Sequence, residues 1–371
     1  MVEQETLNLR VPGSSPGGPS KVYMNRSEQD EIDKILEASL KRDLTVNEIK
    51  KLLYSNKFYW EKIIETADRV KEQFFGKKIY FYVPIYYDSC CINNCLYCDF
   101  RRDNSKCFRK KLNFEEFKKE IDYLDKQGYS KIELVSATDP NFPIESLVRF
   151  VKYVKSLGKD WVLLNNRPLP LEEYQKLKSA GLSWSWLWME SYDKKYYEKY
   201  HPKGTEKANF EKRVKSYDNM AGAGLNVGVA FLMGLSPNWQ DEILATIKHA
   251  KYLKEKYKID IEFGTPRFCP PRYAPIKKSP YPEAMTDDIF KLMIAIYRLA
   301  IRDCWINIST RESIDFMAKL WQGGGNLTNP EAQTIPGGYS LKSKGAQFTH
   351  HSYGMDLFIV KVKELGLEPV L

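Results

Sequence analysis

From residue 78 onward the sequence alternates short apolar runs with amphipathic segments, and this alternation limits the fold more than any other feature. Seven runs rich in β-branched and aromatic residues predict strands at 78–85, 131–135, 161–164, 184–189, 226–231, 259–263 and 305–309. A short eighth strand is predicted near Leu327. Strands that alternate with helices form parallel sheets through right-handed crossovers. We therefore predict an α/β fold, a (β/α)8 TIM-type barrel with an N-terminal helical extension.

Three amphipathic segments precede the first strand and predict helices at about 28–40, 45–54 and 59–74. The second opens with a capping box from Thr45 to Glu48. Four parts of the chain are predicted. Residues 1–22 form an unstructured or expression-derived tail, and residues 23–76 form an N-terminal helical cap. Residues 77–330 form the barrel, and residues 331–371 form a C-terminal extension that packs on the barrel.

The loop after the first predicted strand holds four of the seven cysteines within nine residues. Three of them, Cys91, Cys95 and Cys98, have the spacing Cys-x3-Cys-x2-Cys, which indicates a metal centre. A structural zinc site takes four protein ligands, and a cluster that only transfers electrons takes four cysteines. Three thiolates instead leave one metal with an open position for chemistry. A zinc knuckle, inert thiols, or the spacing Cys90-x4-Cys95-x2-Cys98 are the alternatives.

Polar residues follow most of the predicted strands. In barrels of this type the active site lies at the carboxyl ends of the strands. We therefore expect one shared site built from the polar sets 136–139, 165–167, 190–191, 266–269 and 309–312, together with the cysteine loop.

Composition narrows the class of protein. No run approaches the roughly 20 apolar residues that cross a bilayer, and the start of the chain has no signal-peptide pattern. An odd number of clustered cysteines favours a reducing compartment, so a cytoplasmic location is expected. The net charge of +9 permits nucleic-acid binding. However, the lysines are spread along predicted helices, which makes solvated surface the preferred interpretation and nucleic acid an unfavoured partner.

The cysteine spacing, with aromatic Tyr97 before the third thiolate, resembles the signature of the radical S-adenosylmethionine enzymes. The resemblance implies that Cys91, Cys95 and Cys98 hold a [4Fe–4S] cluster. It also implies that the unique iron chelates S-adenosylmethionine, whose reductive cleavage yields a 5′-deoxyadenosyl radical. A flavodoxin- or ferredoxin-type reductant and a biosynthetic partner protein are further implied.

One branch of that superfamily is resembled closely: the tyrosine lyases, comprising 2-iminoacetate synthase of thiazole (thiamine) biosynthesis and the related [FeFe]-hydrogenase maturation enzyme. The branch also holds a tryptophan lyase and, more distantly, a lysine mutase. The matching segments run from about residue 60 to the C-terminus and include 81–86, 190–197, 201–204, 210, 213, 234–239, 265–267, 309–313, 336–339 and 347–348.

The same resemblance assigns roles to individual residues. Glu190 would contact the ribose or methionine part of S-adenosylmethionine, Arg213 its carboxylate, and Tyr97 would pack by the adenine. Arg311 would clamp the carboxylate of an amino acid, since a planar guanidinium binds a carboxylate bidentately. The alternatives are a salt bridge to Glu312 or Asp315 for Arg311, a structural ion pair for Glu190 and for Arg213, and a plain hydrophobic cover for Tyr97.

Two segments depart from the family pattern. Most of the superfamily has a Gly-Glu pair after the second strand, where this chain has Thr138 and Asp139. Either these two residues substitute in cofactor binding, or cofactor binding is altered. After the sixth strand stands Cys269, which with Ser309 joins Arg311 among the candidate catalytic residues. A buried small hydrophobe is the alternative for Cys269.

The predicted function is an oxygen-sensitive, anaerobic radical enzyme that cleaves the Cα–Cβ bond of a free amino acid. Tyrosine is the first choice, with 2-iminoacetate and a p-cresol fragment as products, and tryptophan or another small molecule is the alternative. A non-catalytic iron–sulfur protein in an assembly complex is the rival from another class, and an RNA-acting enzyme is a third.

Overall fold

The structure is a computed structural model that describes residues 26–371, so the predicted tail at 1–22 lies outside the described residues. One parallel sheet of ten strands organises the chain, in the order β10-β1-β9-β8-β7-β6-β5-β4-β3-β2. The strands are β1 Lys78–Phe81, β2 Val83–Asp88, β3 Lys131–Ser136, β4 Trp161–Asn165, β5 Trp184–Glu190, β6 Asn226–Phe231, β7 Ile261–Gly264, β8 Trp305–Ile308, β9 Leu327–Thr328 and β10 Glu368–Val370.

The sheet curls because one stretch of chain supplies strands near both of its ends. The single strand predicted at 78–85 is two strands, since the chain leaves one edge at Tyr82 and joins the other. β1 pairs with β9 and β10, whereas β2 pairs with β3. The α/β TIM-type prediction is thereby confirmed, with β9 as the predicted eighth strand and β10 as a strand that the sequence did not indicate.

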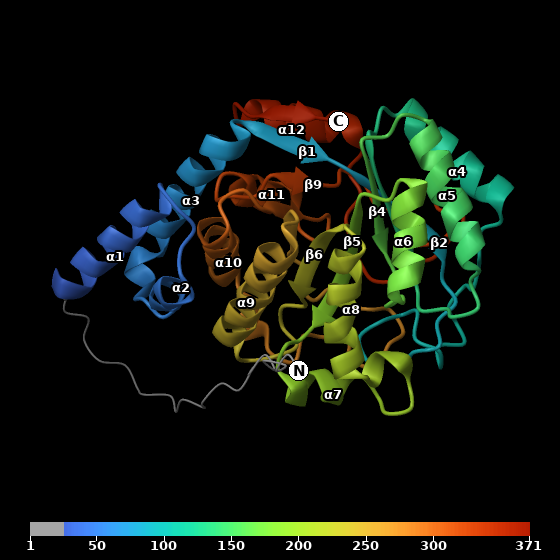
Figure 1. The fold of residues 1–371 in the computed structure, drawn as a ribbon, viewed down its shortest axis with the longest axis horizontal. Helices are drawn as coiled ribbons and strands as arrows, with labels where there is room; N and C mark the ends of the chain where they lie inside the picture. The colour runs from blue at the N-terminus through green and yellow to red at the C-terminus, as the bar shows by residue number, and fades with distance from the viewer. Residues whose placement is uncertain (1–25) are drawn as a thin grey trace.

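Helices connect consecutive strands and cover the outside of the curled sheet (Figure 1). The connecting helices are α4 Phe114–Lys126, α5 Ile144–Ser156, α6 Leu171–Ala180, α7 Lys194–Tyr200, η2 Glu206–Ala208, α8 Phe210–Gly222, α9 Trp239–Tyr257, η3 Pro282–Met285, α10 Asp287–Ala300 and α11 Ile314–Trp321. Their buried faces are largely apolar, as in α10 and α11, which places the main core between helices and sheet.

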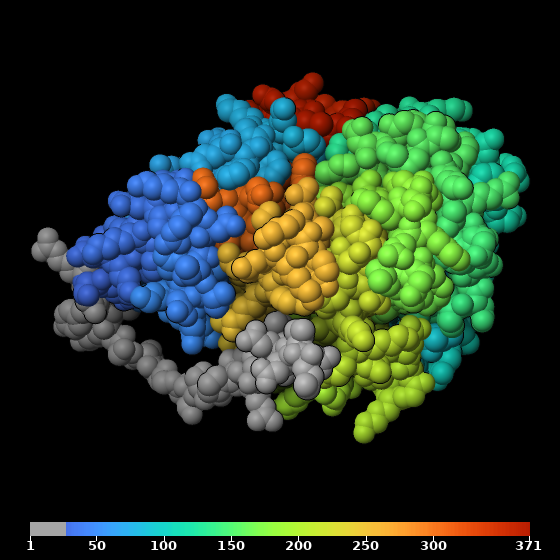
Figure 2. Space-filling model, in the orientation of Figure 1, coloured from blue at the N-terminus to red at the C-terminus, as the bar shows by residue number. Residues whose placement is uncertain are grey.

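The N-terminal helices pack beside α9 and α10, and Figure 2 shows their surface continuous with that of α9. They are α1 Arg26–Ser39, α2 Val46–Leu53, η1 Lys57–Tyr59 and α3 Trp60–Phe75. The capping box between Thr45 and Glu48 is confirmed at the start of α2. Trp60 packs edge-on against Trp239 of α9, with ring centroids 6.2 Å apart.

Aromatic side chains fill the amino-terminal end of the curled sheet. Trp161, Trp184 and Trp305 stand at the first positions of three strands, and Trp161 lies 5.2 Å from Trp184 and 4.5 Å from Trp305 between ring centroids. With Tyr80 and Trp186 they form a core of their own. Because this end is packed shut, any internal cavity must lie toward the carboxyl ends of the strands.

The C-terminal residues return to the first strand. Helix α12 (Met355–Glu364) leads into β10, which pairs with β1. Phe358 of α12 is fully buried against Phe81 and Trp321. The domain boundaries at 76 and 330 stay a prediction. Over residues 26–371, no helix is long and apolar enough to cross a membrane.

Candidate active site

A cavity of about 200 Å³ opens at the carboxyl ends of the strands. Its wall takes residues from the cysteine loop, from the ends of β3, β4, β5 and β8, and from the segment between β9 and α12. Ten of the eleven residues that the sequence singled out line it, namely Cys91, Cys95, Cys98, Tyr97, Thr138, Glu190, Arg213, Cys269, Ser309 and Arg311. The topology therefore brings together side chains that are up to 220 positions apart in the sequence, as from Cys91 to Arg311.

The three thiols of Cys91, Cys95 and Cys98 share this cavity. Within the described chain, no group of three or more His, Cys, Asp or Glu residues is arranged to hold a single metal ion. Three soft ligands around a shared space suit a cluster, in which each thiolate binds a different iron. Burial raises the pKa of Cys95 and of Cys98 to about 11, so metal binding must displace their protons.

Cys90 lies outside the cavity wall. Its backbone N–H donates to the carboxylate of Asp88 at 2.7 Å, which turns the chain as it leaves β2. Burial, with the nearby Asp88 charge, raises the pKa of the Cys90 thiol to about 11. Of the two spacings that the sequence allowed, the structure therefore presents the one that begins at Cys91.

Hydrogen bonds from two distant segments hold the cysteine loop. The buried carboxylate of Asp99 accepts the backbone N–H groups of Arg272, Tyr273 and Ala274 at 2.6–2.7 Å. The Asp99 N–H donates to the Gln347 carbonyl, and the Gln347 amide lies 3.5 Å from the Cys98 sulfur. The loop is thus fixed by the segment after β7 and by the segment before α12.

Glu190 ends β5 in a left-handed backbone conformation, with φ of 68°. That region is costly for a residue with a Cβ and occurs where surrounding contacts impose it. The buried carboxylate accepts a hydrogen bond from Lys207 at 2.5 Å. Arg213 of α8 is also buried, and its Nε donates to the Trp188 carbonyl at 2.8 Å. One wall of the cavity therefore carries two cations and one carboxylate.

Tyr97 lies between the second and third cysteines and donates to or accepts from His201 Nε2 at 2.8 Å. His201 is buried and its Nδ1 faces the Tyr197 carbonyl at 2.7 Å. Burial, followed by the charges of Lys207 and Arg213, keeps the pKa of His201 well below its usual value. The imidazole is therefore neutral and holds the Tyr97 ring against the cavity.

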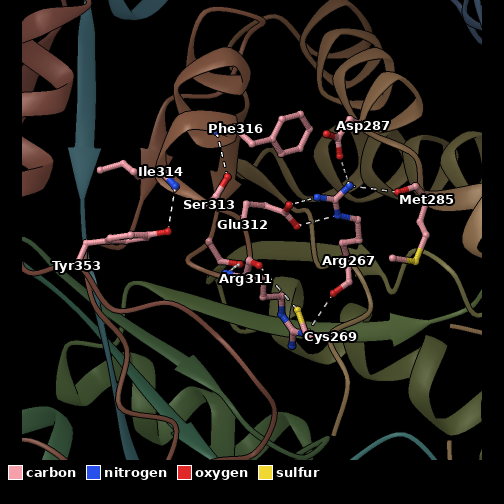
Figure 3. Close-up of polar contacts among 11 residues, drawn as sticks. Arg267, Cys269, Met285, Asp287, Arg311, Glu312, Ser313, Ile314, Phe316 and Tyr353 are labelled. Atoms are coloured by element: carbon pink, nitrogen blue, oxygen red, sulfur yellow. Dashed lines mark hydrogen bonds and ion pairs between the residues drawn. The ribbon is translucent and has the colours of Figure 1, made fainter. Parts of the chain in front are cut away.

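Arg311 follows β8 and presents an unopposed positive charge to the cavity. Its guanidinium stacks on the Phe348 ring at 3.6 Å and donates to the Arg267 carbonyl at 3.3 Å. Across residues 26–371, Arg311 forms no ion pair; the alternative partner Glu312 binds Arg267, and Asp315 binds Lys361. Figure 3 shows Glu312 directed at Arg267, while the Arg311 side chain extends away from it and beside Cys269.

Arg267 is held in place from several sides, which keeps Glu312 occupied. It binds Glu312 through two nitrogens, Asp287 at 2.6 Å and the Met285 carbonyl at 3.2 Å (Figure 3). Its guanidinium also lies 5.0 Å from the Phe316 ring centroid. Because Glu312 is engaged in this way, the charge of Arg311 remains available to a ligand.

Asp139 is the one predicted site residue that the structure does not bring to the cavity. Its carboxylate accepts the Asn141 N–H at 2.9 Å and pairs with Lys111, on the far side of the loop. Thr138 does line the cavity, and its carbonyl accepts the Ile92 N–H of the cysteine loop at 2.9 Å. Of the two residues that stand in place of the Gly-Glu, the structure therefore brings only Thr138 to the cavity, and their role in cofactor binding stays a prediction.

Lys207, Gln347 and Glu133 are among the polar residues of the cavity to which sequence reasoning gave no role. Lys207 lies in the three-residue helix η2 and Gln347 in an irregular segment, and neither is long enough for a periodic pattern to mark an inward side chain. Glu133 lies inside β3, and the signal was present as a glutamate within the apolar run 131–135. Glu133 was not among the predicted site residues, because those were chosen from residues that follow strand ends.

Comparison with known proteins agrees with this geometry. Residues 85–250 match the family described as Radical SAM superfamily. The chain is 28% identical to 2-iminoacetate synthase of Salmonella typhimurium over 76% of this chain and 74% of the relative. It is 27% identical to 2-iminoacetate synthase of Escherichia coli over 86% of this chain and 83% of the relative.

Solved structures point the same way. A crystal structure of HydG, a maturase of the [FeFe]-hydrogenase, superposes with a TM-score of 0.83 at 26% identity, over 93% of this chain and 80% of that one. HydG from Carboxydothermus hydrogenoformans gives 0.82 at 27% identity, over the same shares of the two chains.

The chain therefore contains a radical S-adenosylmethionine domain, built as a curled α/β sheet with its cysteine loop at the carboxyl end of β2. Within that superfamily its relatives are the 2-iminoacetate synthases and the [FeFe]-hydrogenase maturases, which confirms the branch that the sequence motifs resemble.

Proposed function

We propose that this protein is a radical S-adenosylmethionine lyase that cleaves the Cα–Cβ bond of a free amino acid, with tyrosine as the first choice. The observation that carries the proposal is the unpaired guanidinium of Arg311 in the same cavity as the thiols of Cys91, Cys95 and Cys98. The 2-iminoacetate synthases among the relatives support the same reaction, with 2-iminoacetate and p-cresol as products.

The thiols of Cys91, Cys95 and Cys98 would hold a [4Fe–4S] cluster, since the donor set and its spread around the cavity suit one. Cluster and S-adenosylmethionine, when bound, supply a 5′-deoxyadenosyl radical that removes a hydrogen atom from the substrate. A flavodoxin- or ferredoxin-type protein would provide the electron, and the reaction would require anaerobic conditions. A role in thiamine biosynthesis follows from the synthase relatives.

The cation-bearing wall would bind the cofactor. Glu190 accepts hydrogen bonds and is fixed by Lys207, which suits the hydroxyl or ammonium groups of S-adenosylmethionine. Among residues 26–371, Arg213 is anchored through Nε alone, which leaves its two terminal nitrogens for the cofactor carboxylate. Tyr97, held by His201, would cover the adenine.

Arg311 would bind the substrate carboxylate and so orient the Cα–Cβ bond. Stacking on Phe348 fixes the guanidinium plane, and a fixed plane lowers the entropy lost when a carboxylate binds. Ser309 and Cys269 line the cavity beside it and would contact the amino acid. This chain's contribution to catalysis is thus positioning and exclusion of water.

An anaerobic turnover assay tests the proposal. Protein reconstituted with iron and sulfide is reduced with dithionite, given S-adenosylmethionine, and assayed for 5′-deoxyadenosine with tyrosine, tryptophan or no amino acid. We expect 5′-deoxyadenosine to rise with tyrosine and p-cresol to form beside it. If 5′-deoxyadenosine rises with tryptophan alone, the substrate would be assigned as tryptophan instead of tyrosine. No 5′-deoxyadenosine from fully loaded protein would overturn the enzyme assignment.

A further inference from the structure

Glu133 is a carboxylate at the floor of the cavity that the proposed function leaves without a role. It is the third residue of β3, only 4% exposed, and lines the cavity. Its Oε1 accepts a hydrogen bond from the Asn165 amide at 3.0 Å, and across residues 26–371 it has no other hydrogen-bond partner. One carboxylate oxygen is therefore open to a ligand.

Other buried polar groups on neighbouring strands also lack hydrogen-bond partners among the described residues. Both carboxylate oxygens of Glu262 on β7 are buried without a hydrogen bond, as are Trp186 Nε1 and Asn307 Oδ1. The Asn307 amide instead donates to the Tyr82 hydroxyl at 2.8 Å. Glu262 is itself acidic and so cannot form an ion pair with Glu133. The acidic floor therefore has no cation of its own in the described chain.

The cavity is polarised along its depth. Arg311 follows the end of β8, and Lys207 and Arg213 stand on the wall near the end of β5. Glu133 lies three residues before the end of β3, which is roughly 8–10 Å deeper at about 3.3 Å per residue. An elongated ligand with an anionic end at Arg311 and a hydrogen-bond-donating end at Glu133 matches this arrangement.

We propose that Glu133 binds a hydrogen-bond donor at the far end of the substrate side chain, so that the substrate is an amino acid whose side chain ends in a hydroxyl, N–H or ammonium group. This inference rests on the proposed function, because it uses Arg311 to bind the α-carboxylate. Apolar amino acids of the same length would leave the second oxygen of the buried carboxylate without a partner, and they would therefore be rejected.

Binding to the reconstituted protein tests this without turnover. Dissociation constants are measured anaerobically by calorimetry, with S-adenosylmethionine present and no reductant, for two matched pairs: tyrosine with phenylalanine, and lysine with norleucine. We expect the donor-bearing member of one pair to bind at least about tenfold more tightly. The pair that shows the preference identifies the donor as a neutral hydroxyl or an ammonium group.

Three variants assign the preference to Glu133. Glu133→Met removes the acceptor and should reduce the preference below about threefold. Glu133→Gln keeps an amide oxygen that Asn165 can still bond, so it should lose an ammonium preference and retain part of a hydroxyl preference. Glu145→Gln alters an exposed carboxylate on α5 and should leave every constant unchanged.

Absence of any donor preference in the unmodified protein would overturn the inference, as would a preference that Glu133→Met leaves intact. Glu133→Gln keeps the inference testable if Glu133→Met does not fold, because loss of an ammonium preference or weakening of a hydroxyl preference is then the required result. Failure of the proposed function looks different: donor preference would persist while reduced protein forms no 5′-deoxyadenosine.

Discussion

Arg311 is the residue on which the substrate assignment depends most, through its guanidinium group. Replacing it in Arg311→Ala removes a charge-assisted interaction worth about 2–3 kcal/mol, so we expect the KM for the amino acid to rise roughly 30- to 150-fold. Cluster iron and the slow formation of 5′-deoxyadenosine without substrate should be unchanged, because the cysteines and Arg213 are untouched. Steady-state kinetics and iron analysis measure both.

Arg102→Ala is the matched control, because Arg102 is an exposed arginine of the cysteine loop that contacts Asp103. Its kinetics should equal those of the unmodified protein. Equal loss of cluster iron and of substrate response in Arg311→Ala would instead assign Arg311 to the fold of the loop.

Two neighbouring cysteines give a second comparison at the level of side chains. Cys91 lines the cavity, whereas Cys90 lies outside its wall. We expect Cys91→Ser to lose most of the iron and sulfide bound after anaerobic reconstitution, since a serine is a poor ligand for a cluster. Cys90→Ser should retain both. Iron and sulfide analysis with visible absorption spectra measures the bound cluster in both variants. Loss of iron and sulfide in Cys90→Ser but not in Cys91→Ser would assign the ligand to Cys90.

The cysteine loop as an element depends on Asp99. In Asp99→Ala, the backbone N–H groups of Arg272, Tyr273 and Ala274 lose their shared acceptor. Loss of hydrogen bonds to a buried charge predicts a decrease of about 2–4 kcal/mol in the free energy of unfolding. Urea denaturation measures it, and iron retained after gel filtration should fall as well.

Asp103→Ala changes a half-exposed carboxylate of the same loop and serves as the control. Its unfolding free energy should stay within about 0.5 kcal/mol of the unmodified protein. A similar loss in both variants would show that the loop tolerates no change at all, and the specific role of Asp99 would then be wrong.

Strand and helix positions were predictable from the sequence, because periodic burial leaves a pattern in each element. The strand run at 78–85 shows the limit. Its residues are apolar throughout, and nothing in them marks Tyr82 as the point where the chain passes from one sheet edge to the other. β10 was equally invisible, since Glu368–Val370 is three residues long and pairs with a strand 290 positions away.

Site residues divide in the same way. Glu190 and Arg311 lie at or after strand ends and were found by position, whereas Lys207 reaches the cavity from the three-residue helix η2 and Gln347 from an irregular segment. The availability of Arg311 could not be predicted, because it depends on Glu312 being bound by Arg267 after the chain has folded. Spacing identifies ligands close in sequence, but only the fold shows which charges are already paired.

The molecule as a whole contains buried carboxyl groups that should make its stability depend on pH. Burial raises the pKa of Glu133 and of Glu242 to about 7. Each group therefore binds a proton more tightly in the folded than in the unfolded chain between about pH 4.5 and 7. Unfolding releases those protons, so stability falls as pH rises through this range and levels off above it.

Buried histidines act in the opposite direction at lower pH. Burial lowers the pKa of His249 to about 4, so below its usual pKa the unfolded chain takes up a proton that the folded chain does not. Stability then falls as pH decreases below about 6.5. His249 is neutral in the folded chain throughout pH 6.5 to 8, and the unfolded chain loses its remaining imidazole proton near pH 6.5, which offsets only part of the carboxyl effect.

We therefore expect the free energy of unfolding to decrease by about 1–3 kcal/mol from pH 6.5 to pH 8. Glu242→Gln should make this dependence shallower, because Glu242 then no longer loses a proton on unfolding, while the exposed control Glu145→Gln should keep it. Urea denaturation at pH 6.5, 7.2 and 8.0 measures all three proteins. Stability that is constant or increases over this range would contradict the raised pKa values of these buried carboxyl groups.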